Sequence, residues 1–252
     1  MNTSPELLAA MITSAVALLG VIVNSIVLSR TTLRTAEKEH QLQEKRLIRE
    51  RQENSAAVIS RYRDPLLRAA DSLQSRLYNI MDKGFLSRYL ADPPTHDYAL
   101  NSTLYAFAEY LAWVEILRRD VQFLDLGEIE STRGLENRLR DISEIFLDNS
   151  PDPLFKLFRV EQRAIGELMI VRSDVAKHSD CRGYVEFTRS LQDPQFSVWF
   201  ARLSGDVVAL AEAPGRIERI HRLQNALVRL MDQLDPECVR IPKNARQEFR
   251  LP

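Results

Sequence analysis

The stretch YAFAEYLAWVEILRRDVQFL, residues 105–124, decides the fold class of this chain. It lies in a segment from Asp97 to about Leu124 in which apolar residues recur at spacings of three and four, the period of an α-helix. A helix that is apolar on more than one side must be covered on more than one side. We therefore expect a long central helix with other helices packed around it. The apolar residues that lie off the main stripe are Tyr105, Tyr110, Trp113, Ile116 and Phe123.

Two carboxylates, Glu109 and Glu115, stand in the part of this helix that we expect to be buried. An unpaired buried carboxylate is costly, so each needs a partner or an exit to water. Arg118 and Arg119 follow Glu115 at three and four residues, the spacing of an ion pair within a helix. Glu109 lacks such a neighbour, and it must pair with an Arg of another helix or face out through a polar gap. The alternative for both carboxylates is a pocket in which they perform catalysis or bind an ion.

Proline and glycine separate the rest of the chain into further apolar-periodic segments. Asp64-Pro65 and Asp193-Pro194 each predict a helix start, with an N-cap residue followed by proline in the first turn, and Ser131 is placed to cap another helix. Residues 180–191 suit either a short strand or a helix, and we favour the helix. The predicted helices run from Pro65 to near Gly84 with a short continuation at 85–90, from Ser131 to before the turn at 148–153, over Val160–Ile170, from Pro194 to before Ala213, and from Arg216 to about Leu234.

No alternation of period two is long enough to predict a sheet. The predicted fold class is therefore all-α, with about six or seven helices in one bundle-like domain over residues 62–236. Residues 237–252 form a polar C-terminal tail, which we expect to be mobile because terminal polar segments have little to hold them.

Residues 7–29 carry no ionisable side chain. As a helix this segment would reach about 33 Å, and the hydrocarbon core of a bilayer is about 30 Å thick. A cleaved secretory signal begins with a basic region, whereas residues 1–6, MNTSPE, contain no Lys or Arg. Cleavage after Ala17 would also leave a strongly apolar new N-terminus. We therefore expect a retained transmembrane helix, a signal-anchor, preceded by a short extracytoplasmic tail.

The charges that flank this helix predict its orientation. Basic flanks stay in the cytoplasm. We therefore place the chain in the cell membrane as a single-pass protein, with its N-terminus outside and its C-terminal domain cytoplasmic. Two cysteines in 252 residues, Cys181 and Cys238, predict no disulfide framework, in agreement with a reducing compartment. No basic residue precedes the helix, and a run of them follows it: Arg30, Arg34, Lys38, Lys45, Arg46, Arg49 and Arg51.

The membrane helix and the stalk that follows it both offer ways to self-associate. Small and polar side chains recur along one seam of the helix at spacings of three and four, which lets two helices approach closely and predicts a homo-oligomer. The seam residues are Ala10, Thr13, Ala17, Gly20 and Asn24. The stalk, residues 30–61, contains no Gly or Pro and is expected to be helical. Only half of its heptad core positions are apolar, so a solvated stalk and a weak coiled coil both stay open.

No motif for nucleotide or metal chemistry is present in the sequence. Phosphate-binding glycine loops and the nucleophile elbow are missing, and the four histidines are scattered. His178 and Cys181 are three residues apart, but no second Cys/His pair completes a tetrahedral metal site. With 34 basic and 35 acidic residues, no nucleic-acid partner is expected. We therefore predict no catalytic, cofactor or metal site.

The leading hypothesis is a membrane-anchored cytoplasmic domain that binds an unidentified cytoplasmic protein, as a scaffold, adaptor or signalling module. Grooves between helices suit a partner helix or loop without any catalytic motif. Two alternatives stay open. One is a membrane-tethered enzyme of a helical type that uses Glu109 or Glu115. The other is a membrane-perturbing effector controlled by oligomerisation of the anchor.

Overall fold

The computed structural model describes residues 43, 45, 61–120, 129–172 and 179–251. By its internal contacts the chain divides into residues 1–54 and residues 55–252, and the fold below belongs to the second unit. The predicted transmembrane helix with its seam, and all of the stalk except residues 43, 45 and 61, lie outside the described part. Within the described part, no helix combines the length and the apolar character needed to cross a bilayer.

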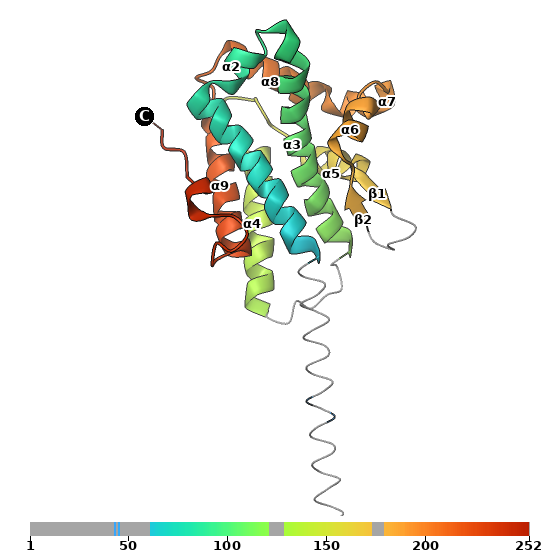
Figure 1. The fold of residues 1–252 in the computed structure, drawn as a ribbon, viewed down its shortest axis with the longest axis vertical. Coiled ribbons are helices and arrows are strands. Elements are labelled where there is room, and N and C mark those ends of the chain that lie inside the picture. Colours follow the sequence, from blue (N-terminus) through green and yellow to red (C-terminus); the bar gives the residue numbers. More distant parts are fainter. Residues whose placement is uncertain (1–42, 44, 46–60, 121–128, 173–178, 252) are drawn as a thin grey trace, which may run out of the picture. The chain divides into compact units, whose positions relative to one another are not determined.

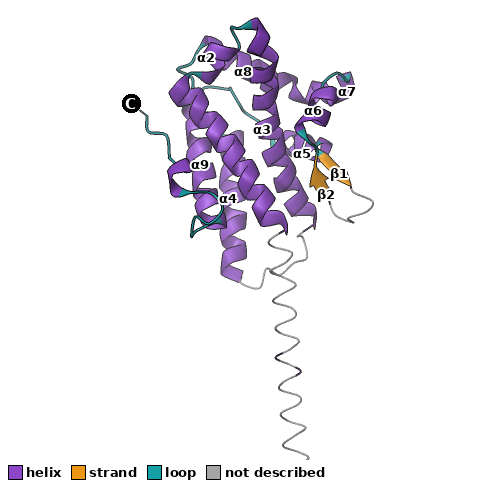
Figure 2. Cartoon of the chain, viewed as in Figure 1, coloured by secondary structure: helices purple, strands orange, loops and turns teal. Residues whose placement is uncertain are grey.

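The described residues are mostly helical, which confirms the all-α prediction (Figure 2). A first helix covers residues 61–83. The 3₁₀ turn η1 (Val198–Phe200) joins α7 to α8, and η2 (Lys243–Ala245) lies in the C-terminal segment. The other elements are α2 (Phe85–Tyr89), α3 (Pro93–Asp120), α4 (Ile129–Leu147), α5 (Arg159–Leu168), β1 (Ile170–Arg172), β2 (Ser179–Cys181), α6 (Tyr184–Ser190), α7 (Pro194–Ser197), α8 (Ala201–Glu212) and α9 (Glu218–Leu234).

Helix α3 lies at the centre of the domain, where its two-sided apolar pattern places it (Figure 1). It contacts α2, α5, α6, α8 and β2. Phe107, on α3, is fully buried and stacks on Phe155 with 5.5 Å between the ring centroids. It also packs edge to face with Phe146 of α4, with 6.2 Å between the ring centroids. Aromatic rings bury the largest apolar areas, so this cluster joins α3, α4 and the segment after α4 into one core.

The helix over residues 61–83 and the α4–α9 pair complete this core. The first helix buries Leu66, Leu73 and Leu77 almost entirely. Helix α4 packs along α9, and the apolar stripe of α9 from Ile220 to Leu234 is buried. Because burial of apolar surface contributes roughly 25 cal/mol per Å², these stripes account for most of the favourable energy of the bundle.

The first helix does not begin at Asp64-Pro65, because the chain is already helical at residues 61–64. Tyr62 lies in this turn with 7 % of its surface exposed, and its hydroxyl donates to Asp120 at 3.2 Å. The Asp64 carboxylate contacts Arg240 at 3.1 Å. The packing of Tyr62 thus extends the helix to the N-terminal side of the predicted start at Asp64-Pro65.

Other capping signals give mixed results. Helix α4 begins at Ile129, so Ser131 lies inside the helix and not at its cap. Helix α3 begins at Pro93, four residues earlier than predicted. In contrast, the Asp193 carboxylate accepts the N–H of Gln195 at 2.9 Å, which confirms a helix start at Pro194. Local signals therefore mark breaks well and exact ends less well, as expected when helix ends fray or extend to reach tertiary contacts.

A two-stranded antiparallel sheet corrects the expectation that the chain forms no sheet. Ile170 of β1 lies opposite Cys181 of β2, and Arg172 lies opposite Ser179. Strands of three residues are too short to show a sustained alternation, which is why the pattern missed them. The ambiguous segment 180–191 contains both structures, the end of β2 and helix α6.

The C-terminal segment, which the sequence predicts to be a polar tail, packs against the domain. Ile241 and Arg246 are 8 % and 6 % exposed. The Gln74 side chain, in the first helix, donates to the carbonyl of Ala245 at 3.0 Å. The fold therefore continues beyond residue 236, held by polar contacts that an apolar pattern does not reveal.

Candidate functional site

An open groove of about 810 Å³ lies between α4 and α9. Its apolar lining comes from Ile145, Leu147 and Ala226, which are half-buried. Side chains of both charges surround this lining, so the groove has the mixed character of a protein-binding surface. These charged residues include Arg138, Asp141, Glu144, Asp148, Arg222 and Arg229.

One wall of the groove is held by an ion pair between Arg222 and Asp148. The Arg222 guanidinium keeps the pKa of Asp148 below its usual range. Two buried polar atoms of the lining, Nε of Arg222 and Oδ1 of Asn225, have no hydrogen-bond partner within the described residues. Buried polar atoms in proteins are normally paired, so these two atoms are exceptions in the groove wall.

Arg219 fixes the end of α4 to α9 from below the surface. It is 4 % exposed. Its guanidinium donates to four backbone carbonyls: those of Ile145 at 3.2 Å, Asp148 at 2.7 Å, Asp152 at 3.1 Å and Leu154 at 2.5 Å. Leaving these carbonyls unpaired would be costly, so Arg219 makes the groove wall a rigid part of the fold.

Glu115 is 2 % exposed and lies among arginines. It accepts hydrogen bonds from Arg118 at 2.6 and 2.7 Å and from Arg119 at 2.7 Å, and Arg163 of α5 lies 3.8 Å away. Burial by itself raises the pKa of Glu115, but the hydrogen bonds from Arg118 and Arg119 outweigh it, and the net pKa is lowered. Arg119 also contacts Glu167 at 3.1 Å, which ties α3 to α5.

Glu109 has a different environment, because no Lys or Arg of the described residues forms an ion pair with it. Its carboxylate is half-buried and accepts a long hydrogen bond, 3.5 Å, from the Tyr105 hydroxyl. Burial raises the pKa of Glu109. Burial and the neighbouring Glu109 and Asp180 raise the pKa of the Cys181 thiol to about 12, so that thiol stays protonated at neutral pH.

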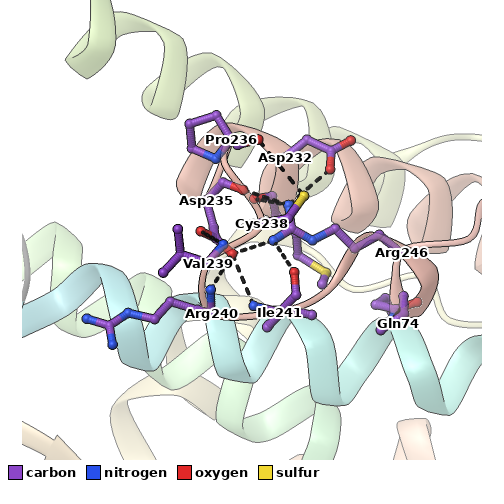
Figure 3. Close-up of polar contacts among 11 residues, drawn as sticks. Gln74, Asp232, Asp235, Pro236, Cys238, Val239, Arg240, Ile241 and Arg246 are labelled. Atoms are coloured by element: carbon purple, nitrogen blue, oxygen red, sulfur yellow. Dashed lines mark hydrogen bonds and ion pairs between the residues drawn. The ribbon is translucent and has the colours of Figure 1, made fainter.

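A buried clasp closes the C-terminal end of α9 (Figure 3). The Asp235 carboxylate accepts the backbone N–H groups of Val239, Arg240 and Ile241 at 3.0–3.1 Å. Arg246 donates to that carboxylate at 2.5 Å and to the carbonyls of Asp235 and Ile241 at 2.8 and 2.7 Å. The side chains of Asp235 and Arg246 are 2 % and 1 % exposed, so the pair is shut off from water.

Burial by itself raises the pKa of Asp235. The three N–H donors and Arg246 outweigh that effect, and its net pKa lies below the usual value.

The structure brings Glu115, Arg118 and Arg119 together and leaves Glu109 apart from them. The residues that organise the groove and the clasp, Arg219 and Arg246, were missed by the sequence reasoning. For a single arginine in a polar or amphipathic stretch, the sequence does not show whether its guanidinium is buried among several acceptors or solvated at the surface. Within the described ranges, no cluster of three or more His, Cys, Asp or Glu side chains is arranged to hold a metal ion, and His178 lies outside those ranges.

Comparison of the chain with protein-family models, with curated proteins and with solved structures found no match in any of the three. The geometry of the grooves and clusters is therefore the basis for the function proposed next.

Proposed function

We propose that the chain is a single-pass membrane protein whose helical domain, on the cytoplasmic side, binds a partner protein as a scaffold, adaptor or signalling module. The uncharged segment 7–29 and the basic residues after it support the anchor and its orientation. The groove between α4 and α9 supports the binding role, and it is the observation that carries the proposal.

The chemistry of the groove favours an amphipathic segment of the partner. Ile145, Leu147 and Ala226 offer a narrow apolar strip to its apolar side. The arginines and carboxylates that also line the groove favour a segment that carries charges of both signs.

The wall behind the groove also suits binding. Arg219 and the Arg222–Asp148 pair already hold the end of α4 in place, so little ordering is needed when a partner docks. Elsewhere, the three hydrogen bonds that Glu115 accepts from arginines support a structural role for that carboxylate over a catalytic one, because most of its roughly four lone-pair sites are already engaged.

The test compares two charge reversals on the same helix. Arg138→Glu changes the groove, whereas Arg140→Glu makes the same change at an exposed position outside the groove lining. The detergent-solubilised full chain and both variants are used for affinity capture, and retained proteins are identified by mass spectrometry. We expect a protein retained by the wild type and by Arg140→Glu and lost, at least tenfold, from Arg138→Glu.

A capture that finds no such protein, or one that both variants retain equally, would contradict binding through the groove. The circular dichroism spectra of the variants control for folding, since both positions are solvent-exposed and neither substitution should alter helix content.

A further inference from the structure

The end of the chain lies in an extended form across the first helix and α9, and side chains hold it there. Gln74 of the first helix donates to the carbonyl of Ala245 at 3.0 Å. The Gln224 side chain, in α9, donates to the carbonyl of Gln247 at 2.7 Å and accepts the N–H of Phe249 at 3.0 Å. Residues 247 and 249 therefore turn their backbone groups toward Gln224, as in a strand, whereas Ala245 ends the 3₁₀ turn η2.

Gln224 forms hydrogen bonds with the backbone of this segment and not with its side chains. Its amide pairs with the carbonyl of one residue and the N–H two positions on, which is how an extended strand pairs with its neighbour. Gln224 is fully buried, and a hydrogen bond of 3.2 Å to Gln74 orients it. The ring Nε2 of His221 lies 2.9 Å from the carbonyl of Phe249 and extends the same set of backbone contacts.

Tyr78, His221 and Gln224 form a seat around Phe249. Tyr78 of the first helix meets it edge to face at 6.1 Å, and His221 of α9 does so at 5.9 Å. Beside it, Arg229 contacts Glu248 at 3.2 Å. The seat thus recognises an acidic residue followed by an aromatic one. Since His221 and Arg229 also line the groove between α4 and α9, the seat and the groove form one continuous surface.

The segment that occupies the seat is held by side chains of the first helix and α9 and not by backbone pairing. Residues 247–250 form no backbone–backbone hydrogen bond within the described part of the chain. Gln247, Glu248 and Arg250 are exposed, and only Phe249 is half-buried. The clasp at Arg246 lies before this segment and holds the chain independently of it. Release of residues 247–251 would therefore break side-chain contacts only and leave the bonds of the clasp in place.

We propose that Tyr78, His221 and Gln224 form a docking seat for an extended acidic-aromatic segment of the partner protein, and that residues 247–251 occupy this seat until the partner displaces them. The inference rests on the proposed function, because the seat, once residues 247–251 are displaced, is continuous with the groove. The shared residues His221 and Arg229, and the charge match of Arg229 with an acidic side chain, favour a partner segment as the occupant.

The test uses the full chain in detergent and a fluorescent peptide, RQEFRLP, with the sequence of residues 246–252. A tethered segment competes at an effective concentration in the millimolar range, so the wild type should bind the peptide weakly. Phe249→Ala weakens the tethered competitor, and we expect at least tenfold tighter binding by fluorescence anisotropy. Arg250→Ala, an exposed neighbour, should bind as the wild type does. A peptide with Ala in place of its Phe should not bind.

Addition of Gln224→Leu to Phe249→Ala should abolish the binding, provided that the circular dichroism spectrum stays native. In the wild type, saturating peptide should speed hydrogen exchange at the amide of Phe249, which needs no substitution in the protein. Equal affinity of the wild type and Phe249→Ala, or unchanged exchange at saturation, would overturn the proposal. So would a wild-type dimer that the peptide dissociates, because it would assign the seat to a second copy of the chain.

The two proposals can fail separately. Peptide binding without any protein lost from Arg138→Glu would leave the seat standing and remove the groove. The reverse result would leave the groove and remove the seat.

Discussion

Glu109 and Glu115 are two identical side chains on one helix whose pKa values are shifted in opposite directions. Glu115 is bound by two arginines of its own helix, and its pKa is lowered. Glu109 is half-buried with only the Tyr105 hydroxyl as a donor, and burial raises its pKa. The spacing of three and four residues predicted the first environment, whereas the second depends on β2 and the residues around it, which lie far along the chain.

These states predict opposite effects of the same substitution. Glu115→Gln should lower the free energy of unfolding at pH 7 by about 2–3 kcal/mol, because it leaves guanidinium groups without their carboxylate and those groups are partly screened by water. Glu109→Gln should raise it by roughly 0.5–1 kcal/mol, because it removes a poorly solvated charge. Urea titration of the full chain, followed by circular dichroism, measures both. A loss of stability in both variants would contradict the assignment for Glu109.

The pH dependence follows from the directions of the shifts. The lowered pKa of Glu115 means that its contribution is present above the unfolded value, 4.5, and is lost as pH falls through the lower folded value. The raised pKa of Glu109 means that its cost is present above the folded value and disappears as pH falls below 4.5. Both variants should therefore move toward the stability of the wild type as the pH falls below 4.5, and a difference that does not shrink with falling pH would have another cause.

At the scale of elements, the contact between α3 and α5 depends on one glycine. Gly166 is buried in α5. A Cβ atom there would lie 2.5 Å from the carbonyl oxygen of Leu111 and 2.9 Å from the Cβ of Glu115. Neither atom can shift easily, because one belongs to the backbone of the central helix and the other is the Cβ of the buried Glu115 side chain. The two helices can approach this closely only because residue 166 has no side chain.

Gly166→Ala should therefore destabilise the domain by about 1–3 kcal/mol, the usual cost of overpacking a core. The control is Gly205→Ala in α8, where a Cβ would meet nothing within 4 Å. That substitution should stabilise by about 0.5–1 kcal/mol, since Ala loses less backbone entropy than Gly in a helix. Thermal unfolding followed by circular dichroism compares the two. Stabilisation by Gly166→Ala would show that α3 and α5 do not pack this closely.

The elements were predictable wherever a break is local. Gly84 adopts a left-handed conformation with φ of 60° at the end of the first helix, and Asp193 caps α7. The strands β1 and β2 were not predictable, because each has three residues and they are stabilised by pairing with one another across the sheet. Neither the early start of α4 nor that of the first helix carried a signal in its own residues.

At the scale of the whole molecule, the anchor proposed for residues 7–29 predicts how the protein fractionates. The full chain should stay in the membrane pellet through an alkaline wash and require detergent for release, because about 20 apolar residues bind the hydrocarbon core too strongly for salt or pH to displace. N-terminal sequencing should find residues before Ala17 still attached. Recovery without detergent, or a terminus trimmed past Ala17, would contradict the anchor.

The same extract tests the seam. Gly20→Leu combined with Asn24→Leu should shift the solubilised protein from oligomer to monomer in sedimentation, because bulky side chains separate the two helices. Ala15→Leu makes a similar small-to-large change on the opposite side of the helix and should leave the oligomer intact. An unchanged oligomer in the double variant would remove the seam as its cause.

The sequence by itself predicts the helical class and the central place of the segment around residue 107. It also predicts most breaks between helices and the pairing of Glu115. These depend on neighbours within about four positions, where helical geometry decides which side chains meet. Tertiary structure decided the roles of Arg219 and Gln224, whose partners lie up to 74 and 150 residues away, and of Arg246, whose partners lie 5 to 15 residues away. Those contacts are polar, so hydrophobic periodicity carries no trace of them, and only packing determines which arginine or glutamine is buried.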